Sequence, residues 1–361
     1  MGLILVPRLG TAVVMRKIDR LSSRRAYFEP RRKEADAPLV DKSVLFLDRA
    51  LSTAFAARMV CSLSPTPIFA LKQTTAPPGC QANHPIPNKD NPMPEDLSCK
   101  TACAFVAGRS HLKTQTPSQD YVAARESNEV TCISLADGAD SRARSDIGAQ
   151  VAVTATLAFV CKNFESLWQN MDKHNAKAAQ RLVNRCLDAF RRKSAKLGGD
   201  INDLACSLSF VAYSRGRYLA GQLGNGVIAS VDADGQLQAL SYPENGELAN
   251  TPLFLTDHKA ASQLKLYRGQ IEATTGFAIM SDGTAESLYD KSSGVPAPAI
   301  QELLEWNATL PRKKMRDVLG DNLQQSIASK TEDDCSIGLL SILKHSIDVG
   351  QTSGVTVSEE K

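Results

Sequence analysis

The chain has 361 residues and a mass of 39.0 kDa, enough for one large domain with an extension or for two medium domains. Its 43% hydrophobic and 22% charged residues are ordinary for a soluble globular enzyme, and a net charge of +3 is too small to indicate a nucleic-acid-binding protein. The nine cysteines are odd in number and irregularly spaced, which excludes a typical disulfide framework and favours a reducing cytoplasm.

The first hundred residues differ from the rest of the chain. Residues 1–36 hold nine basic and four acidic side chains, and eight of the seventeen prolines lie between Pro65 and Pro94. An organelle transit peptide has a similar start, but its scarcity of acids does not fit here. No apolar run approaches the eighteen or so residues of a membrane span. We therefore predict a largely disordered, basic and then proline-rich extension over 1–98, a folded domain over 99–345 and a flexible tail over 346–361.

Hydrophobic periodicity from residue 100 onward predicts a mixed sequence of strands and helices. One helix begins at Ser145 and runs through Cys161, and a second covers Asn175–Lys196. Short turn-like links between the strands favour antiparallel pairing. The predicted fold class is α+β, with two mostly antiparallel sheets packed as a sandwich and flanked by helices. The predicted strands cover 102–107, 121–124, 130–136, 207–213, 217–222, 227–231, 237–242, 264–272, 277–281 and 335–343, and further helices cover 299–306 and 313–327.

Aspartates next to predicted strands are the most informative residues. They are Asp120, Asp137, Asp282 and the pair Asp333 and Asp334. An unpaired buried charge costs several kcal/mol, so carboxylates gathered at strand ends require cations. Ligation by oxygen alone selects hard metals such as Mg²⁺ or Mn²⁺. We expect these side chains to converge on one edge of the sandwich.

The elements and motifs in this order resemble the metal-dependent protein phosphatases, also called type 2C serine/threonine phosphatases, and in particular their bacterial branch. The resemblance covers about residues 108–343. A single Asp-Gly is a common turn, but five separated motifs in the same order are a specific signal. They are Gly108-Arg109-Ser110-His111 with Gln119-Asp120, Ala136-Asp137-Gly138-Ala139-Asp140-Ser141, Gly224-Asn225-Gly226, Ser281-Asp282-Gly283, and Asp333-Asp334-Cys335-Ser336.

The resemblance implies a centre of two Mn²⁺ or Mg²⁺ ions, with a possible third. By position, Asp137 would bridge both ions and the Gly138 carbonyl would bind one of them. Asp120, Asp282 and Asp333 would supply the remaining carboxylates. The spacing favours Asp333 over its neighbour as the ligand.

Two further positions have alternatives that stay open. Asp203 parallels a family aspartate that binds a third, weaker metal, but it also suits a turn between a helix and a strand. Asn225 stands where an aspartate is common, at a position that is usually structural.

The chain departs from the family where substrate phosphate is bound. Gln115 replaces an arginine found in many eukaryotic members, which leaves Arg109 and His111 as candidate catalytic groups, with Lys113 as a further nearby cation. Ala139 occupies the place of a histidine that protonates the leaving group, so water or His111 would take that role.

The resemblance implies hydrolysis of phosphoserine and phosphothreonine in proteins by a metal-activated water, opposing a serine/threonine kinase. Two alternatives are a catalytically silent regulatory module and a phosphatase for a small metabolite. No nucleic-acid or membrane partner is expected, and the expected location is the cytoplasm.

Overall fold

The structure is a computed structural model, and it describes residues 97–232, 234–243, 253–271 and 274–344, apart from the side chains of 172–174, 274 and 344. The predicted extension lies outside these residues except for 97 and 98, and the predicted tail lies wholly outside them. The first strand begins at Leu97, two residues before the predicted start of the domain.

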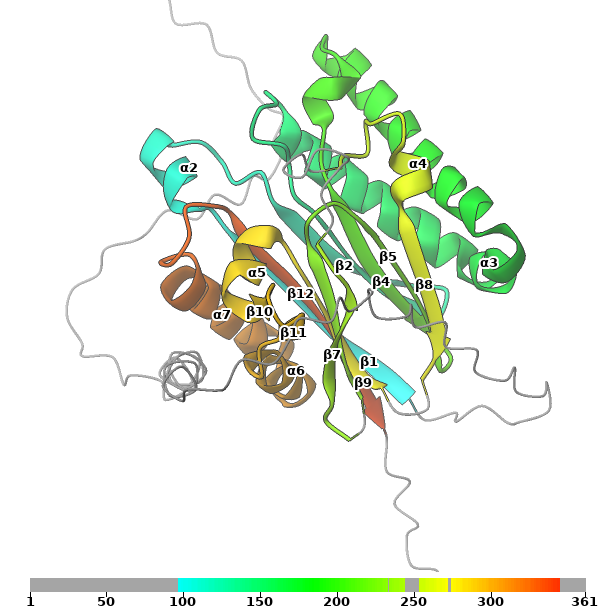
Figure 1. The fold of residues 1–361 in the computed structure, drawn as a ribbon, viewed down its shortest axis with the longest axis vertical. Helices are drawn as coiled ribbons and strands as arrows, with labels where there is room; N and C mark the ends of the chain where they lie inside the picture. The colour runs from blue at the N-terminus through cyan, green and yellow to red at the C-terminus, as the bar shows by residue number, and fades with distance from the viewer. Residues whose placement is uncertain (1–96, 233, 244–252, 272–273, 345–361) are drawn as a thin grey trace, which may run out of the picture. The chain divides into compact units, whose positions relative to one another are not determined.

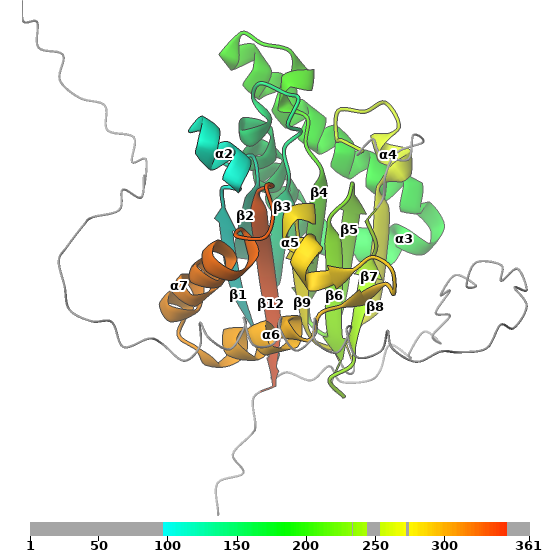
Figure 2. The ribbon, with the colours of Figure 1, turned by 60° about the vertical axis from the view of Figure 1, so that its left-hand side comes forward.

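Two five-stranded antiparallel sheets form the centre of the described part (Figure 1). Figure 2 shows the strands of the first sheet side by side. In spatial order they are β1 (Leu97–Val106), β12 (Cys335–Lys344), β9 (Thr274–Met280), β6 (Val227–Asp232) and β7 (Leu237–Ser241). The second sheet is ordered β2 (Tyr121–Ser127), β3 (Val130–Ala136), β4 (Leu208–Ser214), β5 (Arg217–Leu223) and β8 (Lys265–Gln270).

Helices cover the outer face of each sheet. α3 (Ser145–Leu197) and α4 (Ala260–Gln263) pack on the second sheet, while α6 (Ala299–Thr309) and α7 (Arg312–Asn322), continued by a turn over Leu323–Ile327, pack on the first. The predicted sandwich flanked by helices is therefore confirmed. Short elements complete the fold: α2 (Arg109–Thr114), a 3₁₀ turn over Ile201–Leu204, α5 (Asp282–Leu288), β10 (Tyr289–Asp290) and β11 (Val295–Pro296).

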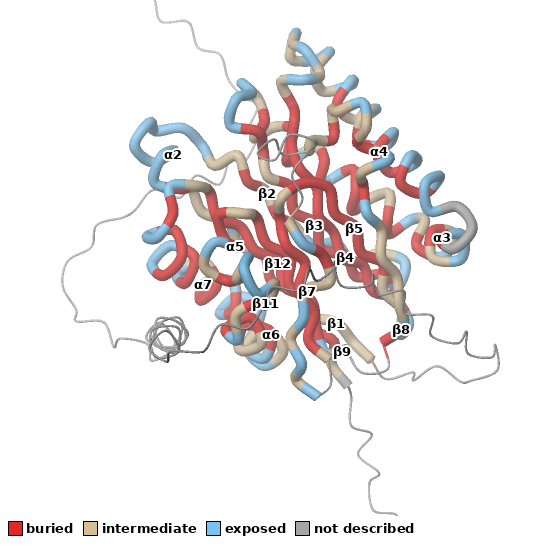
Figure 3. The backbone as a smooth tube through the Cα atoms, in the orientation of Figure 1, coloured by how far each residue is buried: buried red, intermediate tan, exposed pale blue. Residues whose placement is uncertain are grey.

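The central strand β3 contributes side chains to the cores on both faces of its sheet. All seven of its residues are buried. Ile133 and Leu135 join the core between the two sheets, whereas Val130, Cys132 and Ala136 join the core under α3. Successive side chains of a strand point to opposite faces, so a strand covered on both faces is largely apolar (red in Figure 3). The polar residues of β3 are Thr131 and Ser134, and the Ser134 hydroxyl donates to the Ser209 carbonyl at 3.0 Å.

α3 folds back on itself. Arg144 Nη1 donates a hydrogen bond to the Leu197 carbonyl at 3.2 Å, and Thr156 Oγ1 lies 3.5 Å from Cys186 Sγ. A straight helix of this length would separate its ends by about 80 Å. The two predicted helices are therefore two antiparallel halves of α3, lying side by side on the second sheet.

The first half of α3 also changes one expectation from the sequence. Its segment Ser145–Met171 is long and apolar enough, by length and composition, to cross a membrane. However, 56% of its most apolar window is buried in the protein, because its apolar residues cover the second sheet. Within the described residues, this is the one helix that meets those criteria.

Candidate metal centre

Antiparallel pairing brings the predicted aspartates to the same end of the sandwich. Tyr121, which follows Asp120, pairs with Ala136, which precedes Asp137. In the first sheet, Met280 at the end of β9 pairs with Ile337 near the start of β12. A residue before one strand therefore lies beside a residue after its neighbour, which places Asp120 near Asp137 and Asp282 near Asp333.

Close backbone packing joins three of the five motifs. A Cβ atom at Gly108 would lie 2.3 Å from the Asp333 carbonyl, and one at Gly283 would lie 2.2 Å from the Asp334 carbonyl. Neither position tolerates a side chain without a shift of backbone. The Ser281 hydroxyl accepts a hydrogen bond from the Ser336 amide at 3.0 Å and further ties β9 to the start of β12.

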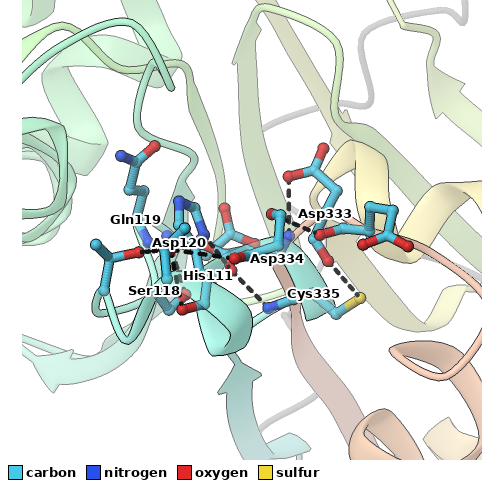
Figure 4. A network of polar contacts seen from close by, with 12 residues as sticks. His111, Ser118, Gln119, Asp120, Asp333, Asp334 and Cys335 are labelled. Carbon is cyan, nitrogen blue, oxygen red and sulfur yellow. Dashed lines mark hydrogen bonds and ion pairs between the residues drawn. The ribbon is translucent and has the colours of Figure 1, made fainter.

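Asp334 anchors the segment that leads to Asp120 (Figure 4). Its side chain is 97% buried, and Oδ1 accepts hydrogen bonds from the Gly108 amide at 2.7 Å and from His111 Nδ1 at 2.8 Å. Its Oδ2 accepts a hydrogen bond from the Gln119 amide at 2.6 Å. Both oxygens are thus engaged by the protein, which makes Asp334 a positioning residue and leaves Asp333 as the more available neighbour.

Asp120 has the opposite environment. Only 3% of the residue is exposed, and neither carboxylate oxygen has a hydrogen-bond partner. Burial, followed by the negative charges of Asp334 and Asp282, raises the pKa of Asp120 well above its usual value, although the nearby Ser336 and Ser281 hydroxyls lower it in part. A buried carboxylate that lacks well-formed hydrogen bonds is unfavourable unless a cation or a proton balances it.

The other three aspartates share this electrostatic field. The pKa of Asp137 is raised by burial and then by the charges of Asp120, Asp282 and Asp333. Burial is also the first cause for Asp282, whose pKa is raised although the Gly283 amide donates to it at 2.8 Å. Burial and the charge of Asp282 raise the pKa of Asp333 to about 7.

Among the described residues, no three His, Cys, Asp or Glu side chains are grouped closely enough to hold a metal ion as they stand. The all-oxygen donor set and the partnerless Asp120 oxygens nevertheless fit Mg²⁺ or Mn²⁺.

Gly138 lies where its backbone can reach the same site. Its amide donates to the Gln119 carbonyl at 3.2 Å, and it forms an isolated bridge with Cys206. A Cβ atom at this position would lie 2.8 Å from the Ser145 carbonyl carbon. With its amide oriented to donate, the Gln119 side chain lies 3.1 Å from the Gly138 carbonyl and 3.0 Å from Asp140 Oδ1.

Asp203 is engaged in local structure. Its carboxylate accepts a hydrogen bond from the Asp200 amide at 3.2 Å, while Asp200 accepts one from the Asn202 amide at 2.7 Å. This reciprocal capping box starts the turn between α3 and β4. The contacts account for Asp203 as a turn residue, and its role toward a third metal stays a prediction.

The two predicted catalytic residues also have partners. Arg109 donates Nε–H to the Thr331 carbonyl at 2.8 Å and pairs with Glu332 at 3.1 Å, with 46% of its side chain exposed. Glu332 also pairs with Lys113 at 3.0 Å. His111 is held by Asp334, which leaves its Nε2 as the nitrogen available to a ligand.

Two groups have roles that the sequence does not predict. Asn225 donates its amide Nδ2 to Asp282 Oδ2 and so orients a predicted ligand, a more specific role than the structural one expected. After burial, the charge of Asp140 is a further cause that raises the pKa of both Asp282 and Asp333. The Asp-x-x-Asp spacing of Asp137 and Asp140 was the available signal.

Several known proteins are similar to this chain. The chain is 25% identical over 264 residues to serine/threonine-protein phosphatase 3 of Escherichia coli (strain K12), covering 67% of this chain and 98% of that protein. Two similar solved structures are the catalytic domain of the phosphatase PstP in complex with two manganese ions, and the S. agalactiae serine/threonine phosphatase. The PstP match has a TM-score of 0.47 and 15% sequence identity, and it covers 69% of this chain and 100% of that chain. The S. agalactiae match has a TM-score of 0.46 and 15% sequence identity, and it covers 68% of this chain and 99% of that chain. The family model for protein phosphatase 2C matches residues 107–324, and because this range is more than half of the chain, the protein belongs to the protein phosphatase 2C family.

Proposed function

We propose that this protein is a metal-dependent phosphatase that hydrolyses phosphoserine and phosphothreonine in proteins. The observation that carries the proposal is the set of four carboxylates at one end of the sandwich, all with raised pKa values, of which Asp120 has no hydrogen-bond partner. Membership of the phosphatase 2C family supports the same chemistry.

Asp120, Asp137, Asp282 and Asp333, with the Gly138 carbonyl, would hold Mn²⁺ or Mg²⁺. Two bound divalent ions supply neutralisation of the phosphate dianion and a more acidic water that can attack phosphorus. No covalent enzyme intermediate is needed. Cys103 and Arg109 have the Cys-x₅-Arg spacing of thiol-dependent phosphatases, but Cys103 lies within strand β1 and burial raises the pKa of its thiol to about 12, which does not suit a nucleophile.

The protein's own residues set the geometry around that site. Asp334 fixes the segment that carries Asp120, and Asn225 orients Asp282. His111, with Nδ1 held by Asp334, would present Nε2 to the phosphate or to the leaving oxygen. Arg109 would have to leave Glu332 before it could bind substrate phosphate.

The test is hydrolysis of p-nitrophenyl phosphate by the purified protein with Mn²⁺, with Mg²⁺ and with a chelator, followed by phosphopeptide and phosphometabolite panels. Metal-dependent turnover with preference for phosphopeptides supports the proposal. Preference for a metabolite would replace the substrate assignment. Metal binding without turnover of any substrate would favour the silent regulatory module.

We also propose that the protein acts in the cytoplasm and that it opposes a serine/threonine kinase. All seven cysteines in the described part are free thiols, which supports a reducing compartment.

A further inference from the structure

The second half of α3 carries an exposed basic face, here called the basic stripe. It consists of six side chains that are all exposed: Lys177, Arg181, Arg185, Arg191, Arg192 and Lys196. Asp188 is the acid on this face, and it pairs with Arg191 at 2.7 Å. The face therefore has a formal charge of +5, more than the +3 of the entire chain.

Helix geometry places five of these six side chains on one side of the helix, and Arg191 lies at its edge. With 3.6 residues per turn, positions 177, 181, 185, 192 and 196 share one side of the helix. The opposite side is buried against the second sheet through Ala178, Leu182, Cys186 and Phe190. The alternation of exposed and buried segments along α3 is visible in Figure 3. At 1.5 Å per residue the stripe is about 28 Å long.

Most of these charges have no role in holding the fold together. Among the interactions of the described residues, Lys177, Arg185, Arg192 and Lys196 form no ion pair. Arg181 lies over the Phe159 ring at 5.7 Å. Like charges four residues apart on a helix destabilise it slightly, so the stripe costs stability rather than adding to it. Such a surface is suited to an external anion.

The stripe starts at the end of the molecule that holds the acidic site. Arg144 binds the Leu197 carbonyl directly after Lys196, and the Ala139 amide donates to the Ala205 carbonyl at 3.0 Å. Residues 139–142 connect the acidic site with the stripe. The charge of Asp140 contributes to the raised pKa of Asp282, and the exposed Arg142 follows two residues later. A polypeptide with one residue at the acidic site could therefore continue along the stripe.

We propose that the basic stripe docks an acidic stretch of the phosphoprotein substrate while the phosphorylated residue occupies the carboxylate site. The proposal rests on the proposed function and adds a substrate class to it. An extended chain rises about 3.3 Å per residue, so about nine residues would cover the stripe.

Other anionic partners fit the stripe less well. A helix that binds at a membrane surface carries large apolar side chains beside its basic ones. Among the described residues, the exposed large hydrophobic side chains are Phe105, Leu112, Tyr242 and Val295, none of which lies on α3. Single-stranded nucleic acid is held by stacking on aromatic rings, and Phe190, the aromatic residue of this half of α3, is buried.

The test compares two phosphothreonine peptides, one with nine acidic residues beside the phosphothreonine and one with glutamines in their place. The variant Arg185→Gln/Arg192→Gln/Lys196→Gln removes three charges without removing helix propensity. We expect the wild-type KM for the acidic peptide to be about tenfold below that for the glutamine peptide, and this difference to disappear in the variant. Hydrolysis of p-nitrophenyl phosphate, which cannot reach the stripe, should stay unchanged.

Two control variants separate docking from general charge. Lys313→Gln/Lys314→Gln/Arg316→Gln removes three exposed charges from α7 on the other outer face and should keep the peptide preference. Arg185→Lys/Arg192→Lys should keep it as well. Equal loss in both triple variants, or full preference in the α3 variant, would overturn the proposal.

A second experiment measures docking without turnover. A fluorescent, unphosphorylated form of the acidic peptide is titrated with the protein, and binding is measured by fluorescence anisotropy. A protein that hydrolyses no phosphomonoester but binds this peptide through α3 would refute the proposed function and still support the stripe. Tighter binding of single-stranded DNA or phosphatidylserine vesicles through the same residues would overturn docking of an acidic peptide.

Discussion

His111 and Asp334 lie 223 positions apart in the chain, and the imidazole Nδ1 is 2.8 Å from the carboxylate Oδ1. The same carboxylate receives the Gly108 and Gln119 amides, so one buried side chain holds both ends of the segment that leads to Asp120. The position of a predicted metal ligand therefore depends on a residue that is itself saturated with hydrogen bonds.

Asp334→Asn should destabilise the protein and lower its activity. The amide keeps one acceptor oxygen but places an NH₂ group against backbone N–H donors, so we expect a loss of about 2–3 kcal/mol in the free energy of unfolding. Urea unfolding followed by circular dichroism measures this loss. Asp317→Asn, at an exposed position of α7, serves as the matched control and should change stability by less than about 0.5 kcal/mol.

Asp137→Asn should abolish turnover and leave the fold intact. It removes one charge from a crowded acidic site, so the melting temperature of the metal-free protein should stay the same or rise. We expect Mn²⁺-dependent hydrolysis to fall by at least about a hundredfold. Asp282→Asn should behave alike. A wild-type rate in either variant would contradict the assignment of these residues as ligands.

The metal-free protein should lose stability as pH rises from about 4 to about 7. Burial and the charge of Asp282 raise the pKa of Asp333 to about 7, whereas an aspartate in the unfolded chain loses its proton near pH 4. In this window the native state binds more protons than the unfolded state, so stability falls with rising pH. Thermal unfolding with chelator should give a higher Tm near pH 5 than near pH 8. Saturating Mn²⁺ should reverse that order, because metal binding requires the deprotonated carboxylates.

Asn225→Asp should weaken the metal-free protein most at alkaline pH. Asn225 donates to Asp282, and a carboxylate in its place would exchange an attractive contact for repulsion. We expect a loss of about 1–2 kcal/mol near pH 8 and a smaller loss near pH 5. Asn225→Ser, which removes the amide without adding charge, separates repulsion from the lost hydrogen bond. Equal unfolding curves for all three proteins at pH 8 would contradict an orienting role.

Deletion of residues 1–96 should leave the phosphatase activity unchanged. β1 begins at Leu97 and pairs with β12 from that residue onward, so the shortened chain keeps the complete first sheet. The measurement is kcat/KM for p-nitrophenyl phosphate together with the solubility of the shortened protein. Loss of either would show that the extension packs against the domain.

Local patterns in the sequence are sufficient for the long strands, the long helices and the fold class, but not for the short elements α4, β10 and β11. β3 coincides with the predicted strand over 130–136, because a largely apolar run that ends at Asp137 has clear limits. α2 and α5 were missed, since each is short and lies among motif residues whose turn-like composition gives no helical periodicity. The two helices of α3 were recognised, but their antiparallel contact was not predicted.

Some features of the candidate site can be predicted from the sequence, and others follow only from the tertiary structure. Asp120, Asp137, Asp282 and Asp333 are predictable from the sequence, because each lies in a short motif within two residues of a strand and the order of these motifs resembles the phosphatase 2C family. Only the tertiary structure decided that Asp334 is an anchor, that Asn225 orients Asp282 and that Asp203 completes a capping box. These roles depend on which donors reach a carboxylate across the sheets, and a single sequence does not encode such distances in any local pattern.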